Sequence, residues 1–381
     1  MKIVSVMTTD ASGGAEFAAI EMLGALRERG HETVMLSDLP RIGRETQVEV
    51  RLVDLGPKLS GRTWIGLIPQ WPALFRRLRT ALEAEAPYDV LLLHYKKEQL
   101  LARMLPARLR RTTVWSEWGP VPVQMRKGVG RWLYVAAGRE VPLVMAVSAG
   151  TRESVQSVGV DGAKVTVVPN VLRTDEIGYT ESGRREVRER LGIPMDAFVV
   201  GCISRFHPKK RNDVVVEAVR ELEDPRVHLI LAGDGETGGA LRELARPLDG
   251  RAHFMATPGQ EVADVLSAFD VSVFCPSPAE GAPRAVILGM LAARPCLATG
   301  AEGVADMIAP EFGAIASPEN DPGALRELLR PYLEDPGRVA RQGGAGRAYA
   351  ERTYAAPVVA KLIEGLLQDA VAGRSPGAHA G

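Results

Sequence analysis

The sequence predicts an α/β protein built of two halves, in each of which helices cover a parallel β-sheet. Two observations lead to this prediction. At 381 residues the chain is too long for one ordinary core, and two domains of roughly 180 residues each are the natural expectation. Short runs of Val, Ile and Leu also alternate with amphipathic segments, a pattern typical of parallel strands joined by right-handed helical crossovers.

In the first half, apolar runs predict seven strands, at 3–7, 32–36, 48–53, 89–93, 112–115, 143–147 and 165–168. Amphipathic segments predict helices at 16–29, 73–85, 97–109 and about 149–158. Gly30 follows the first of these helices, in the position where glycine commonly ends a helix. Because strands and helices alternate, the loops at the carboxyl ends of the strands are the expected place for ligands.

A charged stretch without periodicity, at 170–193, interrupts this rhythm and predicts the connection between the halves. The second half resumes it with strands at 198–203, 228–232, 253–256, 271–275 and 296–299. Its helices are predicted at 212–222, 239–248, 260–269, 283–293, 324–333, 337–353 and 357–371. The last helix is expected to cross back to the first half. The Gly-, Pro- and Ala-rich segment 372–381 should form a loose tail.

Composition narrows the possible classes of protein. Lys and Arg total 47, as do Asp and Glu, so whole-chain charge offers no case for nucleic-acid binding. Cys202, Cys275 and Cys296 show no C-x-x-C spacing, and buried thiols in a reducing compartment are the simplest interpretation. The apolar start at 1–7 is too short for a signal peptide. No uninterrupted apolar stretch approaches the length of a membrane span, and a cytoplasmic location is expected.

The most informative segment is 277–290, which reads S-P-A-E-G-A-P-R-A-V-I-L-G-M. It joins the predicted strand at 271–275 to a helix that begins at Pro283, with Glu280 at the junction. At such a junction a parallel sheet presents backbone N–H groups and a helix dipole to anionic ligands. A carboxylate is not needed there for folding. It indicates recognition of hydroxyl groups beside a bound phosphate, as a nucleotide-sugar would supply.

A basic loop follows the first predicted strand of the second half. It reads S-R-F-H-P-K-K-R at 204–211 and holds four cations. Cations at the carboxyl end of a strand suit a reaction that expels a nucleoside diphosphate, because negative charge grows on the leaving oxygens. Removing one such group typically costs on the order of 2.7–4 kcal/mol. We expect Arg205 and Lys210 to have this role; the alternative is an ordinary solvated charge run.

The first strand-to-helix junction contains the pair Gly13-Gly14, which lets the backbone approach a ligand closely. The pattern is not G-x-G-x-x-G, so a dinucleotide cofactor is poorly supported, and a plain tight turn is the alternative. No cofactor or metal is expected. The chain has no D-x-D, its six histidines show no ligand spacing, and no G-x-S-x-G elbow occurs.

Aromatic and basic residues are mixed in the segment 62–79. Further cations of the first half are Arg108, Arg110, Arg111, Arg126, Lys127 and Arg131. This mixture fits contact with an anionic membrane or a phosphorylated acceptor. The alternative is an ordinary core helix with a solvated basic edge.

Taken together, these motifs resemble those of the family 4 retaining glycosyltransferases, and the resemblance covers nearly the whole chain. The matching segments are G-G-A-E at 13–16, V-V-P-N at 167–170, S-R-F at 204–206 with Lys210 beyond it, L-A-G-D-G at 231–235, and E-G-A-P at 280–283. Each motif alone is weak. Their order and spacing make the resemblance specific.

The resemblance implies the GT-B fold, in which two Rossmann-like domains face each other across a cleft and a C-terminal helix crosses back to the N-terminal domain. We place an N-terminal acceptor-binding domain at 1–175 and an interdomain linker at 176–195. A nucleotide-sugar-binding domain follows at 196–352. The crossover helix is expected at 353–371 and a flexible tail at 372–381.

Residue roles follow from the resemblance. Arg205 and Lys210 would hold the diphosphate, and Glu280 would bond to hydroxyl groups of the donor sugar. Gly14 would approach the diphosphate from the first domain. The full donor-binding set is Gly13, Gly14, Pro258, Gly281, Ala282, Pro283, Arg284 and Leu288.

Two positions depart from the family pattern. The family's second glutamate, which contacts the ribose, corresponds to Leu288, so ribose recognition must differ or the donor is unusual. The family's T-x-H motif corresponds to 116–118, where Trp118 replaces the histidine. An indole can stack on a sugar face but cannot replace the two imidazole nitrogens. His94 and Glu117 are the nearby candidates to substitute for it in an acceptor or sugar pocket.

The sequence therefore predicts a metal-independent retaining glycosyltransferase that uses a nucleotide-sugar donor and a small-molecule, lipid or glycan acceptor. The resemblance implies same-face attack without a protein nucleophile, and no nucleophile motif is present. Peripheral contact with the inner face of the membrane is compatible with the basic segment. Two alternatives stay open: a nucleotide-sugar epimerase on the same fold, and a catalytically degenerate nucleotide-sugar-binding partner protein.

Overall fold

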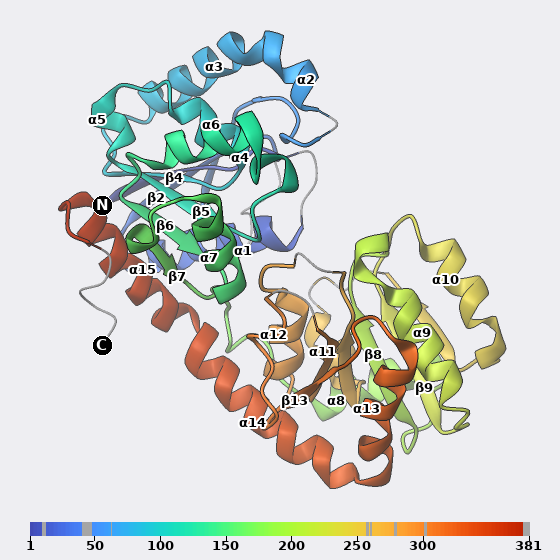
Figure 1. Ribbon diagram of the computed structural model, residues 1–381. Helices are drawn as coiled ribbons and strands as arrows, with labels where there is room; N and C mark the ends of the chain where they lie inside the picture. The colour runs from blue at the N-terminus through green and yellow to red at the C-terminus, as the bar shows by residue number, and fades with distance from the viewer. Residues whose placement is uncertain are drawn as a thin grey trace. The chain divides into compact units, whose positions relative to one another are not determined.

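The computed structural model describes residues 1–9, 13–39, 48–61, 63–256, 259, 261–277, 280–300 and 303–375. The chain divides into two compact units. Unit 1 comprises Met1–Leu172 together with the chain from Ala356 onward, and unit 2 comprises Arg173–Ala355. Each unit is a parallel α/β structure, and the C-terminal helix belongs to unit 1 (Figure 1). The fold class predicted from the sequence is confirmed.

Unit 1 contains a seven-stranded sheet in the order β3-β2-β1-β4-β5-β6-β7. Every adjacent pair is parallel. The strands are β1 Lys2–Val6, β2 Glu32–Ser37, β3 Glu49–Leu52, β4 Val90–Leu93, β5 Thr113–Glu117, β6 Leu143–Ala146 and β7 Val165–Val167. The order reverses between β1 and β4, which places the usual ligand-binding position of such sheets at the carboxyl ends of these two strands.

Helices cover both faces of this sheet. They are α1 Gly14–Glu28, α2 Trp64–Leu67, α3 Trp71–Ala84, α4 Lys96–Ala102, α5 Ala107–Arg110, α6 Gly128–Gly138, α7 Ala149–Val158 and α15 Ala356–Val371, with 3-10 turns η1 Ile68–Gln70, η2 Val123–Met125 and η3 Gly162–Lys164. Ile3 of β1 packs in the core beneath α1 and α15, whereas Val4 and Val6 pack beneath α3, α4 and α6. This alternation is the two-residue period of a strand buried on both faces.

Unit 2 contains a six-stranded parallel sheet in the order β10-β9-β8-β11-β12-β13. The strands are β8 Phe198–Ile203, β9 Val227–Ala232, β10 Ala252–Met255, β11 Val271–Phe274, β12 Cys296–Thr299 and β13 Gly313–Ala316. The helices are α8 Glu181–Leu191, α9 Asn212–Glu221, α10 Gly238–Ala245, α11 Val262–Ser267, α12 Arg284–Leu291, α13 Pro322–Glu334 and α14 Pro336–Tyr354, with 3-10 turns η4 Pro208–Lys210 and η5 Arg246–Leu248. Helices α9, α10 and α13 pack on one face, and α8 and α11 on the other.

Three of the main elements were not predicted. Helix α6 contains three glycines, which weaken any sequence signal for a helix. Strand β13 is a short edge strand with little apolar pattern. Helix α8 lies where the sequence indicated an interdomain connection. It was missed because it is charged throughout and buries few side chains. The predicted helix 97–109 is also wrong, since the chain breaks before Pro106 into α4 and α5.

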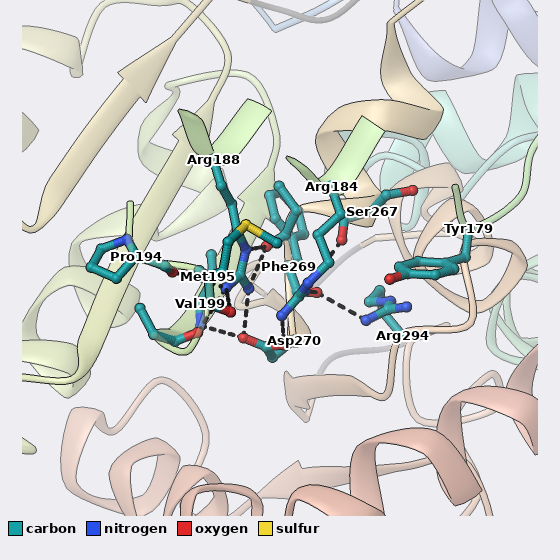
Figure 2. A network of polar contacts seen from close by, with 12 residues as sticks. Tyr179, Arg184, Arg188, Pro194, Met195, Val199, Ser267, Phe269, Asp270 and Arg294 are labelled. Atoms are coloured by element: carbon teal, nitrogen blue, oxygen red, sulfur yellow. Dashed lines mark hydrogen bonds and ion pairs between the residues drawn. The ribbon is translucent and has the colours of Figure 1, made fainter. Parts of the chain in front are cut away.

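A buried ionic network fixes α8 to unit 2 (Figure 2). The fully buried guanidinium of Arg188 donates to the carbonyls of Ala268 and Ala197 and to the Asp270 carboxylate at 2.9 Å. Asp270 also accepts from Arg184 (2.9 Å) and from the backbone N–H of Val199 (2.7 Å). Because Asp270 precedes β11 and Val199 lies at the start of β8, this network occupies the amino edge of the sheet.

Two further observations bear on the class of protein. Among the described residues, no helix combines the length and the apolar character needed to cross a bilayer. The three cysteines are buried free thiols, and burial raises the pKa of each.

Candidate functional site

The carboxyl end of β8 leads into the basic loop that the sequence analysis singled out. Arg205 lies exposed in this loop, and Lys210 is the last residue of η4. The backbone N–H of Phe206 donates to the carbonyl of Asp234 at 2.8 Å, and that of Thr237 donates to the Phe206 carbonyl at 3.1 Å. These bonds fix the basic loop against the chain that leaves the neighbouring strand β9.

Two glycines beyond β9 permit this close packing. A Cβ atom on Gly233 would lie 1.9 Å from the carbonyl oxygen of Ser204, and one on Gly235 would lie 2.3 Å from that of Phe206. Their φ angles of 157° and 150° are also rarely adopted by other residues. The structure therefore gives a physical reason for the L-x-G-x-G pattern: both glycines keep the basic loop in position.

A second loop, which follows β11, is joined to the basic loop. The backbone N–H of Ser277 donates to the carbonyl of Lys209 at 2.8 Å, and its hydroxyl donates to the same oxygen at 3.0 Å. Next to this contact, the Lys210 ammonium and the Glu280 carboxylate form an ion pair at 2.5 Å. The ammonium lies 5.1 Å from the centroid of the Phe274 ring. The structure thus brings together two predicted site residues that are 70 positions apart.

The turn after Glu280 leads into helix α12, whose N-cap is Pro283. Gly303 packs directly against this turn: a Cβ at position 303 would lie 1.6 Å from the carbonyl oxygen of Gly281 and 2.7 Å from that of Glu280. Its φ of 80° also favours glycine. Gly303 therefore shapes the turn that carries Glu280. Sequence reasoning missed it, and no motif around position 303 pointed to it.

The other predicted residues of unit 2 have mixed placements. The residues of the turn are buried or half-buried, namely Gly281, Ala282, Pro283 and Arg284. Leu288 is half-buried and packs against the apolar cluster formed by α8, α11 and the sheet. Its side chain therefore has a packing role in α12. Pro258 lies outside the described residues.

In unit 1, the predicted glycine pair begins helix α1. Gly13 is the N-cap residue, and Gly14 is exposed. A Cβ on Gly14 would meet no described atom within 4 Å, so packing does not require a glycine there. A Cβ on Gly13 would lie 3.3 Å from the Glu16 carboxylate, which accepts a hydrogen bond from the Tyr95 hydroxyl. Glu16 therefore folds back beneath the loop and joins it to the end of β4.

His94 and Trp118 are in direct contact. The indole N–H of Trp118 donates to His94 Nδ1 at 3.0 Å, and the two rings stack with centroids 5.7 Å apart. Because Nδ1 accepts, the ring proton lies on Nε2, which donates to the Ser5 hydroxyl at 2.7 Å. Burial lowers the pKa of His94 to about 3. His94 is therefore neutral, and both of its nitrogens are occupied.

Glu117 is also occupied within unit 1. Its carboxylate pairs with the Lys96 ammonium and accepts from Gln99 and from the Tyr134 hydroxyl, each at 2.9 Å. All four side chains are buried, and burial lowers the pKa of Lys96 even though Glu117 opposes the shift. His94 and Glu117 thus belong to closed polar networks. The expectation that they substitute for the missing family histidine finds no support in this geometry.

Trp118 borders a small recess in unit 1. The recess lies between α1 and the carboxyl ends of β5, β6 and β7, and its lining includes Met22, Ser116, Met145 and Pro169. Apart from Ser116 and the indole, the lining is apolar. Trp118, one of the three residues predicted for an acceptor or sugar pocket, borders this recess.

Glu98 is a further buried charged residue of unit 1, and sequence reasoning missed it. It is fully buried, and its Oε1 accepts from the backbone N–H (3.1 Å) and the hydroxyl of Thr8 at the carboxyl end of β1. Its Oε2 has no hydrogen-bond partner among the described residues. Burial raises the pKa of Glu98, and Lys97 opposes this shift. The signal in the sequence was the polar run H-Y-K-K-E-Q at 94–99, directly after a buried strand.

No group of three or more His, Cys, Asp or Glu side chains within the described ranges is arranged to hold a metal ion. At the carboxyl edge of unit 2, the Lys210 ammonium and the Glu280 carboxylate are joined to each other, and Arg205 lies in the same loop as Lys210. This arrangement suits an anionic ligand that also carries hydroxyl groups.

Two parallel α/β units of this topology define the GT-B fold. Residues 12–176 match the family model described as Glycosyltransferase Family 4, and residues 183–349 match the model described as Glycosyl transferases group 1. The chain therefore belongs to the family 4 glycosyltransferases. A solved structure of Anabaena Alr3699/HepE in complex with UDP-glucose has a TM-score of 0.81 to this chain at 20% identity, covering 97% of this chain and 100% of that one.

Two curated relatives have names that state different acceptors. A D-inositol 3-phosphate glycosyltransferase of Streptomyces avermitilis is 30% identical over 247 residues, which is 61% of this chain and 52% of the relative. A 2-deoxystreptamine glucosyltransferase of Streptomyces kanamyceticus is 25% identical over 367 residues, 87% of this chain and 92% of that one. The chain thus spans about half the length of the first relative.

Proposed function

We propose that this protein is a metal-independent retaining glycosyltransferase, which moves a sugar from a nucleotide-diphosphate sugar to an acceptor hydroxyl. The observation that carries the proposal is the Lys210–Glu280 ion pair at the carboxyl edge of unit 2, within a chain of this family. A cation for the diphosphate and a carboxylate for sugar hydroxyls stand side by side there.

The ion pair defines what donor binding must do. The two side chains are about one quarter exposed and neutralise each other, so a donor must separate them. The diphosphate takes Lys210, with Arg205 as a second cation from the same loop, and the donor sugar offers hydroxyl groups to Glu280. Each freed charge gains a charge-assisted hydrogen bond in exchange for the one it loses.

The proposed chemical step needs no protein nucleophile. The acceptor oxygen attacks the anomeric carbon on the face from which the diphosphate departs. The bond between the anomeric carbon and the β-phosphate oxygen breaks, and that oxygen accepts the proton of the acceptor hydroxyl. Lys210 and Arg205 stabilise the charge that grows on the leaving group, while N–H groups at the start of α12 contribute backbone donors.

The donor and acceptor are proposed by class. A UDP-sugar is the first donor to test, because the similar Anabaena structure holds UDP-glucose. Small-molecule cyclitols are the first acceptors, because the relatives named above act on inositol 3-phosphate and 2-deoxystreptamine; lipid and glycan acceptors come next. We propose a cytoplasmic location with peripheral contact at the inner face of the membrane, and the three free buried thiols fit a reducing compartment.

The test is release of nucleoside diphosphate from a panel of nucleotide-sugars, with and without acceptors. Lys210→Ala should lower transfer by roughly 10²- to 10³-fold, as loss of one group that stabilises a growing charge does. Lys209→Ala is the matched control, since that neighbouring lysine is exposed; its transfer should stay close to that of the wild type. Equal activity of the two variants would refute the assignment of the site.

The two alternatives give different results in the same assay. An epimerase would convert the donor sugar without an acceptor and without releasing nucleoside diphosphate. A degenerate partner protein would show a thermal shift with a nucleotide-sugar and no turnover with any acceptor. The closed networks around His94 and Glu117 give an epimerase no free acid or base at these two positions.

A further inference from the structure

Charge is unevenly distributed along the chain. Although the whole protein is balanced, residues 55–139 of unit 1 contain fifteen Lys and Arg against five Asp and Glu. Three of those five acids are buried, namely Glu85, Glu98 and Glu117, as are two of the cations, Lys96 and Lys97. The stretch 118–139 contains four cations and no acid at all. This part of unit 1 therefore presents a positive surface on a protein of zero net charge.

Large apolar side chains are exposed within the acid-free stretch. We call residues 123–133, which comprise η2 and the first half of α6, the α6 segment. Val123, Val129 and Trp132 are 76%, 73% and 67% exposed. Tyr134 and Ala137 form the buried side of the same helix. Val129, Trp132 and Leu133 lie within one turn of each other, and all three are exposed. Helix α6 is therefore apolar on its outer side as well as on its inner side.

A second segment repeats this pattern. We call residues 64–70, which comprise α2 and η1, the α2 segment. Trp64, Ile65 and Ile68 are 49%, 67% and 57% exposed, and no acid occurs between positions 55 and 82. Leu67 packs in the same core as Met125, so the α2 and α6 segments cover the same face of the unit 1 sheet (Figure 1).

We propose that the α2 and α6 segments form a surface that docks unit 1 onto an anionic lipid bilayer. Exposed Trp, Val and Ile next to Arg126, Lys127 and Arg131 are the combination that binds at a headgroup boundary, with aromatic rings at the interface and cations against phosphates. Nucleic acid would satisfy the cations and leave the aliphatic side chains in water. The proposal rests on the peripheral membrane contact proposed above, for which it identifies the surface, and it does not depend on sugar transfer.

The test is cosedimentation with vesicles of phosphatidylcholine alone and of phosphatidylcholine mixed with phosphatidylglycerol. Binding should require the anionic lipid and fall with added salt. Lys127→Gln should weaken partitioning about fivefold, and Trp132→Ser about tenfold or more. Two exposed residues on α15 give matched controls. Lys361→Gln is compared with Lys127→Gln, and Val358→Ser is compared with Val129→Ser. Both α15 variants should bind as the wild type does.

Circular dichroism should show native helix content for every variant, because all the altered side chains are exposed. Equal binding to the two kinds of vesicle, or equal losses in the test and control variants, would overturn the proposal. So would the absence of vesicle binding together with a dimer in light scattering that Val129→Ser converts to monomer. That result would make the surface an interface between copies of the chain.

Discussion

Two buried ionic networks, one in each unit, lie at opposite edges of their sheets. In unit 2, Arg188 and Asp270 occupy the amino edge, where every oxygen of Asp270 accepts a hydrogen bond and Arg188 donates to several carbonyls. In unit 1, the Glu117 network and the separate Glu98 carboxylate lie at the carboxyl edge, and one Glu98 oxygen has no partner in the part of the chain that the structure describes. A fully satisfied network fixes elements together.

The difference teaches which buried charges belong to folding and which lie near function. Ligands bind at the carboxyl edge of parallel sheets, so the amino edge is free to be optimised for stability alone. The unit 1 network follows β4 and β5 and adjoins Trp118. An unsatisfied buried oxygen there costs stability. Its position beside the predicted site residues explains why such a cost is tolerated.

The largest expected effect is at the amino edge of unit 2. Asp270→Ala leaves the Arg188 guanidinium buried without its carboxylate, and breaking a buried pair in this way typically costs about 3–5 kcal/mol. We expect the free energy of unfolding in urea to fall by that amount. Transfer activity per folded molecule should be retained, because the network lies away from the ligand edge. Exposed Asp175→Ala, in the same unit, is the control. A loss below about 1 kcal/mol for Asp270→Ala would mean that the Arg188–Asp270 network does not stabilise the fold.

A substitution in the Glu117 network tests the carboxyl edge of unit 1. Glu117→Gln keeps acceptors for Gln99 and Tyr134 but removes the charge partner of Lys96. We expect a smaller loss, about 1–3 kcal/mol, because Lys96 already has a lowered pKa and can lose its proton. Activity per folded molecule should fall as well, since Trp118 follows directly. If Glu117→Gln shows the expected loss of stability but unchanged activity, the unit 1 network would serve folding alone, as the unit 2 network does.

The sequence predicted the fold from the alternation of apolar and amphipathic segments. It also predicted that Lys210 and Glu280 belong to one site, because each follows a recognisable strand end. The structure joins the two side chains, and their role in donor binding stays a prediction. It did not predict Arg188–Asp270, whose members are 82 positions apart and lie in segments without a motif. The same holds for Gly303, whose role depends on one close approach between two loops. Local patterns reveal strand ends, whereas contacts between distant loops emerge only from the tertiary structure.

The departures at Trp118 and Leu288 show the same limit. Their identities are visible in the sequence, but what they contact is not. Trp118 donates to a neutral histidine, and Leu288 packs between helices. The sequence suggested that neighbouring groups replace the missing family histidine. The structure shows those neighbours held by partners of their own.

The smallest expected effect concerns Glu98, where a substitution should raise stability and not lower it. Burial raises the pKa of Glu98 above its unfolded value of about 4.5, so the folded state holds a proton that the unfolded state releases as the pH rises. Stability should therefore fall as the pH increases from 4.5 through the folded pKa. Glu98→Gln removes the charge and should stabilise the protein by about 1 kcal/mol at neutral pH, with no gain below pH 4.5. Urea unfolding of this variant and of exposed Glu153→Gln across that range measures the difference. A gain that does not depend on pH would mean that Glu98 is ionised in the folded protein, and the carboxyl edge would then hold a compensated charge like that of Asp270.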